Sequence, residues 1–385
     1  MTPELDFADR VRRVEPSATL AISNAASELE ADGVDVVDLS VGEPDFDTPE
    51  NVKAAAREAL DAGHTGYTPS QGIPALREAI AEKLHDDGLD QYGPEHVTVT
   101  PGAKQALYEV FQALIDDGDE VVLLDPAWVS YEAMVKLAGG SLERVDTAQY
   151  DFRLEDALGD LNGVVTDDTE LLVVNSPGNP HGAVYSRGAL EGVRDLAVDH
   201  DVTVLSDEIY DEITYGETPA RIGTLEGMRD RTITINGFSK AYAMTGWRLG
   251  YFAGPDELVS EAGKLHSHSV SCAVNFVQRA GIEALRNTDE SVAEMVAAFE
   301  ERRDLLVDLL AERGVEVPAP QGAFYAMVPV DEDDSAWCEA AIEDAHVATV
   351  PGSAFGTPGY ARFSYANSQD RLREAVDRLA GEGLL

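Results

Sequence analysis

Three charged side chains stand in surroundings where an unpaired charge would be costly. Lys240 lies in Gly-Phe-Ser-Lys-Ala-Tyr-Ala-Met-Thr-Gly-Trp-Arg, among small and aromatic residues in a chain that is otherwise rich in acids. Asp207 directly follows an apolar run, and Arg362 lies inside the strand-like run Tyr-Ala-Arg-Phe-Ser-Tyr-Ala. Because a buried charge needs a partner, all three are candidates for binding or catalysis.

Each of these residues also has a plainer interpretation. The Asp207 carboxylate could pair with a protonated pyridine nitrogen, or it could cap the next turn. The planar fork of Arg362 suits a substrate carboxylate held through two hydrogen bonds, and the alternative is an internal salt bridge. Lys240 could be a solvated lysine, but its apolar neighbours argue against that interpretation.

A candidate phosphate site lies in Pro101-Gly102-Ala103-Lys104, where an apolar run ends and a helical pattern begins. The first backbone N–H groups of a helix have no partner within the helix, and the macrodipole places partial positive charge there. This motif is weak evidence by itself, because Pro-Gly before a helix is most often only a turn.

The elements that must position these residues alternate between short apolar runs and helix-period segments. This alternation is typical of βαβ units around a mostly parallel, buried sheet. Ligands bind beyond the carboxyl ends of such strands, and polar or aromatic candidates follow each run. The expected strands are Val97–Thr100, Glu120–Leu124, Leu171–Asn175, Val202–Ser206 and Thr232–Asn236. The candidate residues that follow these strands are, in the same order, Gly102, Trp128, Asn179, the pair Asp207 and Tyr210, and the pair Lys240 and Arg248.

The chain is expected to form two domains. From about Ser291 the pattern changes to a long charged helix over 292–313, followed by short alternating runs around 322–328 and 362–366. We therefore predict a large α/β domain over residues 42–290. A smaller α+β domain would combine residues 1–41 with residues 291–385.

The composition excludes several classes of function. The 72 acidic and 28 basic residues leave a formal net charge of −44, so nucleic acid and anionic membranes are poor partners. Only six basic residues are lysine, which suggests adaptation to concentrated salt, where charge repulsion is screened. Two cysteines offer neither a disulfide framework nor a metal cluster, and neither an export signal nor a membrane-spanning segment is expected. A cytoplasmic protein is therefore predicted.

Longer motifs resemble one family along nearly the whole chain. They are Glu15-Pro-Ser-Ala-Thr, Ser40-Val-Gly-Glu-Pro-Asp-Phe-Asp-Thr-Pro, Gly66-Tyr-Thr-Pro, Asn175-Ser-Pro-Gly-Asn-Pro and the segment from Asn236 to Arg248. The chain resembles the fold-type-I, class I aminotransferases that use pyridoxal 5′-phosphate (PLP), and within them the bacterial and archaeal branch of aspartate aminotransferases. The resemblance implies a large domain with a mostly parallel seven-stranded sheet, a smaller α+β domain and a homodimer.

The resemblance also implies a role for individual residues. Lys240 would form the Schiff base with PLP and later move a proton, Asp207 would pair with the pyridinium nitrogen, and Tyr210 would hydrogen-bond the phenolic oxygen. Trp128 would stack on the ring and, like Asn179, contact both cofactor and substrate. The phosphate would be surrounded by Gly102, Ala103, Lys104 through its backbone, Ser239, Arg248 and Tyr67 of the neighbouring subunit. The substrate α-carboxylate would meet Asn179, Arg362 and the backbone of Gly42, and the distal carboxylate would meet Lys104, Ser17 and Thr19.

The implied reaction moves an amino group between an amino acid, here expected to be aspartate, and a 2-oxo acid, expected to be 2-oxoglutarate. Three departures from the family's usual pattern bear on specificity, namely His181, Gly237 and the segment 266–274, which could line the partner's pocket. An aromatic or prephenate aminotransferase and a PLP-dependent β-eliminating lyase are the alternatives on the same fold. A PLP-binding transcription regulator would need a DNA-binding module and a basic surface, for which this chain has no room.

Overall fold

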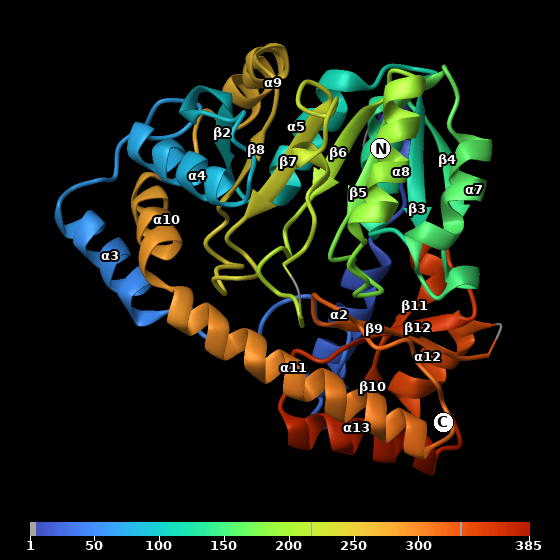
Figure 1. Cartoon of the computed structure of the whole chain (residues 1–385). Helices are drawn as coiled ribbons and strands as arrows, with labels where there is room; N and C mark the ends of the chain where they lie inside the picture. The colour runs from blue at the N-terminus through green and yellow to red at the C-terminus, as the bar shows by residue number, and fades with distance from the viewer. Residues whose placement is uncertain (1–4, 217, 332) are drawn as a thin grey trace.

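The computed structural model describes residues 5–216, 218–331 and 333–385. A seven-stranded sheet forms its centre, with the strand order β2-β8-β7-β6-β5-β3-β4 (Figure 1). All neighbouring strands are parallel except β8, which runs antiparallel to both β2 and β7. The strands are β2 (Val97–Thr100), β3 (Glu120–Asp125), β4 (Ser141–Asp146), β5 (Thr169–Asn175), β6 (Thr203–Asp207), β7 (Thr232–Gly237) and β8 (Gly250–Ala253).

The mostly parallel seven-stranded sheet confirms the predicted fold class, and each of the five expected strands lies within two residues of an observed one. The sequence pattern missed β4 and β8. Strand β4 lies at the edge of the sheet and pairs only with β3, so its side chains are mixed in burial and form no apolar run. Strand β8 has only four residues and begins with glycine, which breaks the apolar pattern.

Helices cover both faces of the large sheet, because the buried strands alternate in the direction of their side chains. Val121 and Leu123 of β3 pack with α5 (Ala103–Leu114), α6 (Val129–Ala138) and α9 (Asp256–Ser269). Val122 and Leu124 pack on the other face with α7 (Leu154–Val164) and α8 (Arg187–Asp199). The sheet core therefore holds the carboxyl ends of β5, β6 and β7 in fixed positions.

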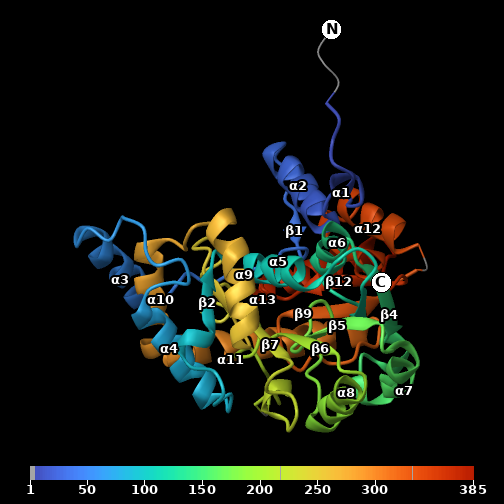
Figure 2. The same ribbon diagram turned by 90° about the horizontal axis from the view of Figure 1, so that it is seen from above.

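A third helical layer gathers beside β2 at one end of the large sheet, as Figure 2 shows. It consists of α3 (Glu50–Asp61), α4 (Pro74–Asp86) and α10 (Asn275–Asn287). Its core joins these helices to Tyr242 and Met244, which follow the candidate lysine in the sequence. This layer therefore supports the Lys240 loop from one side.

A smaller α+β unit lies below the large sheet in the view of Figure 1. Its long helix α11 (Asp289–Glu312) starts near α10 and runs along this unit. Its three-stranded sheet has the order β11-β12-β9, and β1 pairs in parallel with β10. The remaining elements are α1 (Asp9–Arg12), α2 (Ala18–Ala31), β1 (Val37–Asp38), β9 (Tyr325–Pro329), α12 (Asp334–Glu343), β10 (Val347–Ala348), β11 (Val350–Pro351), β12 (Tyr360–Ser364) and α13 (Gln369–Gly381).

The pairing of β1 with β10 joins the N-terminal segment to the C-terminal part of the chain. Helix α1 instead packs against α6, and Arg13 forms an ion pair with Asp117 at 3.3 Å. The division into residues 42–290 and residues 1–41 with 291–385 stays a prediction. Among the described residues, no helix combines the length and the apolar character needed to cross a membrane.

Candidate active site

A cavity of about 440 Å³ opens at the carboxyl ends of β5, β6 and β7, between the large sheet and the smaller unit. This size is typical of a pocket for a small molecule. Most of the predicted site residues line it. They are Thr19, Gly42, Ala103, Lys104, Trp128, Asn179, Asp207, Tyr210, Ser239, Lys240, Arg248 and Arg362.

The Lys240 side chain ends in this cavity, in the loop that follows β7. Its Nζ donates a hydrogen bond to the carbonyl oxygen of Gly42 and lies 5.5 Å from the ring centroid of Tyr210. Burial, together with the positive charge of Arg362, lowers the pKa of Lys240 to about 7. A large fraction of the amine is therefore neutral near pH 7, as a nucleophile or base requires.

Asp207 ends β6, and its side chain is only 3% exposed. The hydroxyl of Tyr131 donates to Oδ2 at 2.6 Å, and the backbone N–H of Ile209 donates to Oδ1 at 3.2 Å. Within the ranges that the structure describes, no cationic side chain forms an ion pair with this carboxylate. Burial raises its pKa to about 6, so a bound cation beside it would be strongly favoured.

Tyr210 follows Asp207 by three residues and presents its hydroxyl to the same cavity. The hydroxyl lies 3.0 Å from that of Tyr325, whose strand β9 belongs to the smaller unit. Burial and the neighbouring Tyr325 raise the pKa of Tyr210 well above its usual range, so the hydroxyl keeps its proton. It can therefore donate a hydrogen bond to an anionic oxygen in the cavity.

Arg362 lies on β12 and is 2% exposed, as expected for a guanidinium inside a strand. Its Nη1 donates to Oδ1 of Asn179 at 3.0 Å, and its Nη2 donates to the carbonyl oxygen of Ser40 at 2.6 Å. Its Nε has no partner among the described residues. Both observed acceptors are neutral, which contradicts the internal salt bridge and leaves the positive charge available for a carboxylate.

The predicted phosphate site is formed where α5 begins. Gly102 precedes the helix with a φ of 87°, and a Cβ added there would lie 2.6 Å from Nη2 of Arg248. Only glycine therefore lets this guanidinium approach the helix N-terminus. Arg248 is held in turn by a 2.7 Å hydrogen bond from Nη1 to the carbonyl oxygen of Thr245. With Ser239 and Ala103 beside it, this corner combines positive charge with helix-terminal N–H groups.

Lys104 and Trp128 form the mouth of the cavity. The ammonium nitrogen of Lys104 lies 4.8 Å from the ring centroid of Trp128, and Lys104 has no ion pair in the part of the chain that the structure describes. Burial, and then the charge of Arg248, lower its pKa. Thr19 lines the cavity, whereas Ser17 does not line it and contacts the hydroxyl of Thr19 at 2.9 Å.

Tyr67 lies outside the cavity of its own chain and is 92% exposed. The backbone of the segment that carries it is held by Asn275, whose Nδ2 donates to the carbonyl oxygen of Gly66 at 3.0 Å. An aromatic side chain this exposed on a held backbone is available to a second molecule.

Sequence reasoning missed several cavity residues. Tyr131 and Tyr325 contact Asp207 and Tyr210, and Glu43 accepts a 2.8 Å hydrogen bond from Thr245. Tyr131 follows Trp128 by three residues on α6, a helical spacing that could have indicated it. Tyr325 comes from a strand far along the chain, and no local pattern marks it.

The three departures lie outside the cavity lining. His181 is buried and stacks on Phe152, and burial lowers its pKa to about 4, so its ring is neutral. Gly237 ends β7, where a Cβ would meet the backbone of Gly250 at 3.1 Å. His266 is 0% exposed and contacts Glu109 at 2.9 Å, whereas His268, Ser271 and Val274 of the same segment are exposed, so a contribution of 266–274 to a partner's pocket stays a prediction.

Comparison with known proteins agrees with this geometry. The family model described as aminotransferase class I and II matches residues 34–379. The chain belongs to this family. An aspartate/prephenate aminotransferase of Thermus thermophilus is 45% identical over 380 residues, covering 96% of this chain and 97% of that protein. An aspartate aminotransferase of Bacillus sp. strain YM-2 is 41% identical over 385 residues, covering 97% and 98% of the two chains.

A solved structure of aspartate aminotransferase from Thermus thermophilus with maleate superposes with a TM-score of 0.94 at 42% identity. The match covers 98% of this chain and 100% of the other. This chain is therefore a PLP-dependent aminotransferase with the fold of these enzymes. Its cavity fits PLP, because a carboxylate without a cationic partner among the described residues, a lysine whose pKa is lowered to about 7 and the N-terminus of α5 surround one space.

Proposed function

We propose that this aminotransferase moves the amino group of aspartate to 2-oxoglutarate. The observation that carries the proposal is a cavity lined by two cationic side chains that lack carboxylate partners among the described residues, Arg362 and Lys104. Aspartate and 2-oxoglutarate both carry two carboxylates, so each could occupy both cations. The names of the relatives support this assignment, and so does maleate, a dicarboxylate, in the Thermus thermophilus structure.

When bound, PLP supplies an electron sink that stabilises negative charge at the substrate Cα. Lys240 would bind the cofactor covalently through Nζ and, once released, would move the proton between the substrate Cα and C4′ of the cofactor. The pKa near 7 suits both tasks, because the amine can take up and release a proton near neutral pH. Asp207 would keep the ring nitrogen protonated, and Tyr210 would donate to the phenolic oxygen.

The other residues would hold the cofactor and the substrate. The phosphate would bind to Ser239, Arg248 and the backbone of Gly102, Ala103 and Lys104. Trp128 would stack on the ring, and Asn179 would contact both cofactor and substrate. Arg362 would hold the α-carboxylate with Gly42, and the Lys104 ammonium, with Thr19 and Ser17 behind it, would hold the distal carboxylate.

The active enzyme would be a homodimer, in which the exposed Tyr67 of each subunit reaches the phosphate of the other. It would work in a salt-rich cytoplasm, where the formal charge of −44 is screened. The large domain, residues 42–290, and the discontinuous small domain, residues 1–41 and 291–385, would enclose the substrate between them.

Prephenate is a second candidate amino acceptor, because the Thermus thermophilus relative is named for both aspartate and prephenate. Prephenate also carries two carboxylates, so the same two cations could hold it.

A screen of amino donors against 2-oxoglutarate, and of 2-oxo acid acceptors against the best donor, tests the assignment. We expect aspartate to have the highest kcat/KM among the donors, and prephenate to be an acceptor of lower or comparable efficiency. The assignment is wrong if alanine or phenylalanine is a better donor than aspartate. A product that forms without consumption of an acceptor would instead indicate the eliminating lyase.

A further inference from the structure

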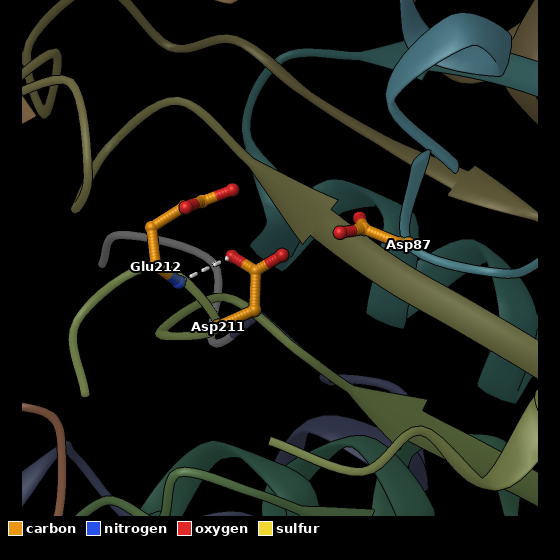
Figure 3. Close-up of side chains that lie close together, drawn as sticks. All are labelled: Asp87, Asp211 and Glu212. Atoms are coloured by element: carbon orange, nitrogen blue, oxygen red, sulfur yellow. Dashed lines mark hydrogen bonds between the residues drawn. The ribbon is translucent and has the colours of Figure 1, made fainter. Parts of the chain in front are cut away.

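Six charged side chains form a cluster behind the segment that carries Asp207 and Tyr210. Two are cations and four are carboxylates, and they come from α4 and its C-terminus, from the turn after β6, and from the residue before a short 3₁₀ turn at 222–224. Figure 3 shows three of the carboxylates, with oxygens that lie within 4.8 Å of one another. We call this group the ion cluster, and its members are Lys83, Asp87, Glu208, Asp211, Glu212 and Arg221.

The first cation, Lys83, is not drawn in Figure 3, but it hydrogen-bonds all three of the carboxylates shown there. Its Nζ donates to Asp87 and to Asp211 at 3.0 Å each, and to Glu212 at 2.5 Å. Each of the three carboxylates that could hold a metal ion therefore already accepts a hydrogen bond from the Lys83 ammonium group. The ion cluster is an ion-pair network that ties α4 to the turn after β6.

The second cation, Arg221, joins two of the same carboxylates and adds a third. It donates to Asp211 at 3.0 Å, forms an ion pair with Asp87 at 2.7 Å, and hydrogen-bonds Glu208. Glu208 also accepts a 2.9 Å hydrogen bond from the hydroxyl of Ser206. The bonds in this part of the cluster are charge-assisted, and such bonds are shorter and roughly twice as strong as those between neutral groups.

The turn after β6 presents its side chains to two different sites. Asp207, Ile209 and Tyr210 line the active-site cavity. Glu208 and Asp211, which alternate with them, do not line it; their side chains are buried and engage the two cations. A displacement of either anchor would therefore move a cofactor-facing neighbour that is one residue away in the chain.

Lys83 and Asp211 keep their charges near neutral pH, whereas burial raises the pKa of Glu208. Burial opposes ionisation of Asp211, but Lys83 and Arg221 outweigh it and lower the pKa of this carboxyl. Burial likewise opposes the charged form of Lys83, but Asp211 and Glu212 raise its pKa well above the usual range.

We propose that Lys83 and Arg221 are positioning residues for amino transfer, which hold Asp207 and Tyr210 in place through the anchors Glu208 and Asp211. The proposal rests on the proposed function, because it takes from it the contacts of Asp207 and Tyr210 with PLP. Groups that act on a reacting ring must be held to within a fraction of an ångström, and buried ion pairs supply such support from behind.

The test is a pH titration of the visible absorbance of PLP bound to the Lys83→Met holoenzyme, together with its PLP dissociation constant. The partners of the ring nitrogen and phenolic oxygen set the proton affinity of the bound cofactor, so their displacement should shift the midpoint by about one pH unit. We expect PLP to dissociate about tenfold more readily. Lys83→Arg, which keeps the charge, should restore much of both properties.

Arg378→Met is the matched control. Arg378 lies on α13, does not line the cavity, and has a similar pair of contacts at 2.6 Å, to Asp35 and Glu374. Its loss should lower the melting temperature and leave the absorbance midpoint unchanged. A Lys83→Met enzyme that behaves like this control, less stable but with the wild-type midpoint and PLP affinity, overturns the proposal.

If Lys83→Met does not fold, Asp87→Asn tests the positioning role in its place. It removes one charge shared by both cations without touching the turn after β6, and a smaller shift in the same direction is expected. An unchanged midpoint and PLP affinity in Asp87→Asn would refute the positioning role. Asp207→Asn is the reference variant for the absorbance titration. If it leaves the titration midpoint unchanged, the contact of Asp207 with PLP is refuted. That outcome contradicts the proposed function and not the role of the ion cluster.

Discussion

Replacing Lys104 by alanine tests how the cavity distinguishes acidic from neutral substrates. The ammonium lies at the cavity mouth over Trp128, and it has no carboxylate partner among the residues described. A charge-assisted hydrogen bond to a distal carboxylate contributes about 1.5–3 kcal/mol. Its loss should therefore lower kcat/KM for aspartate and for 2-oxoglutarate about 10- to 100-fold.

The assay compares donors within the same variant. Steady-state rates with alanine and phenylalanine, which have no distal carboxylate, should change little. Lys104→Met serves as a control for packing, because it retains an apolar side chain near Trp128 and removes only the charge. The methionine and alanine variants should lose similar amounts of activity toward aspartate.

The pH dependence gives an independent check. Burial, followed by the charge of Arg248, lowers the pKa of Lys104, so the ammonium loses its proton at a lower pH than an ordinary lysine. In the wild type, the preference for aspartate over alanine should therefore decline on the alkaline side, and this decline should be absent in Lys104→Ala. If the substitution depressed all donors equally, Lys104 would be a cofactor-site residue and the reasoning would be refuted.

Four further predictions concern the cofactor, the buried carboxylate, the dimer and salt. Lys240→Ala should fold and retain some PLP but lose turnover, and borohydride should fix PLP to Lys240 in the wild type; label on another lysine would contradict the assignment. Burial raises the pKa of Asp207 in the folded protein to about 6 from its usual 3.8, so the PLP-free protein should lose up to about 3 kcal/mol of stability as pH rises from 4 to 7. PLP-free Asp207→Asn should thus be more stable than wild type at pH 8 but not at pH 4, although kcat of the loaded variant should fall by orders of magnitude; near wild-type kcat would remove the proposed role. Tyr67→Phe should weaken PLP binding several-fold without unfolding the chain, as measured by equilibrium dialysis, and an unchanged affinity would argue against its reach across a dimer. Melting temperature and activity should rise together from low to molar KCl, because the Debye length falls to roughly 3 Å at 1 M; flat or falling curves would exclude salt adaptation.

The fold class could be predicted because buried parallel strands leave a local signature. Runs such as Leu171–Asn175 are apolar on both faces, and the polar residues that follow them mark the edge where ligands bind. Strand β4 left no such signature, because its position at the sheet edge exposes alternate side chains. The local pattern therefore predicted five strands and missed the edge strand β4 and the short internal strand β8.

The sequence also indicated which charged residues belong to the site. A lysine among small and aromatic residues, an aspartate at the end of an apolar run and an arginine inside a strand each indicate a charge withdrawn from water. The structure confirms burial for Asp207 and Arg362, and Lys240 is half-buried.

The sequence by itself thus indicated that Asp207 and Arg362 are withdrawn from water and which edge of the sheet carries the site, because their neighbours in the chain are apolar. It did not indicate the burial of Glu208, Asp211 and Arg221. Only the tertiary structure decided what each buried charge meets. Arg362 donates a hydrogen bond to the carbonyl oxygen of Ser40, which is 322 residues away in the chain. Asp207, at the end of β6, accepts a hydrogen bond from Tyr131 of helix α6. Of the anchors behind Asp207, Asp211 meets Lys83 from α4 and Glu208 meets Arg221 in the same way. Such partners are set by the packing of distant elements, which no spacing along the chain encodes.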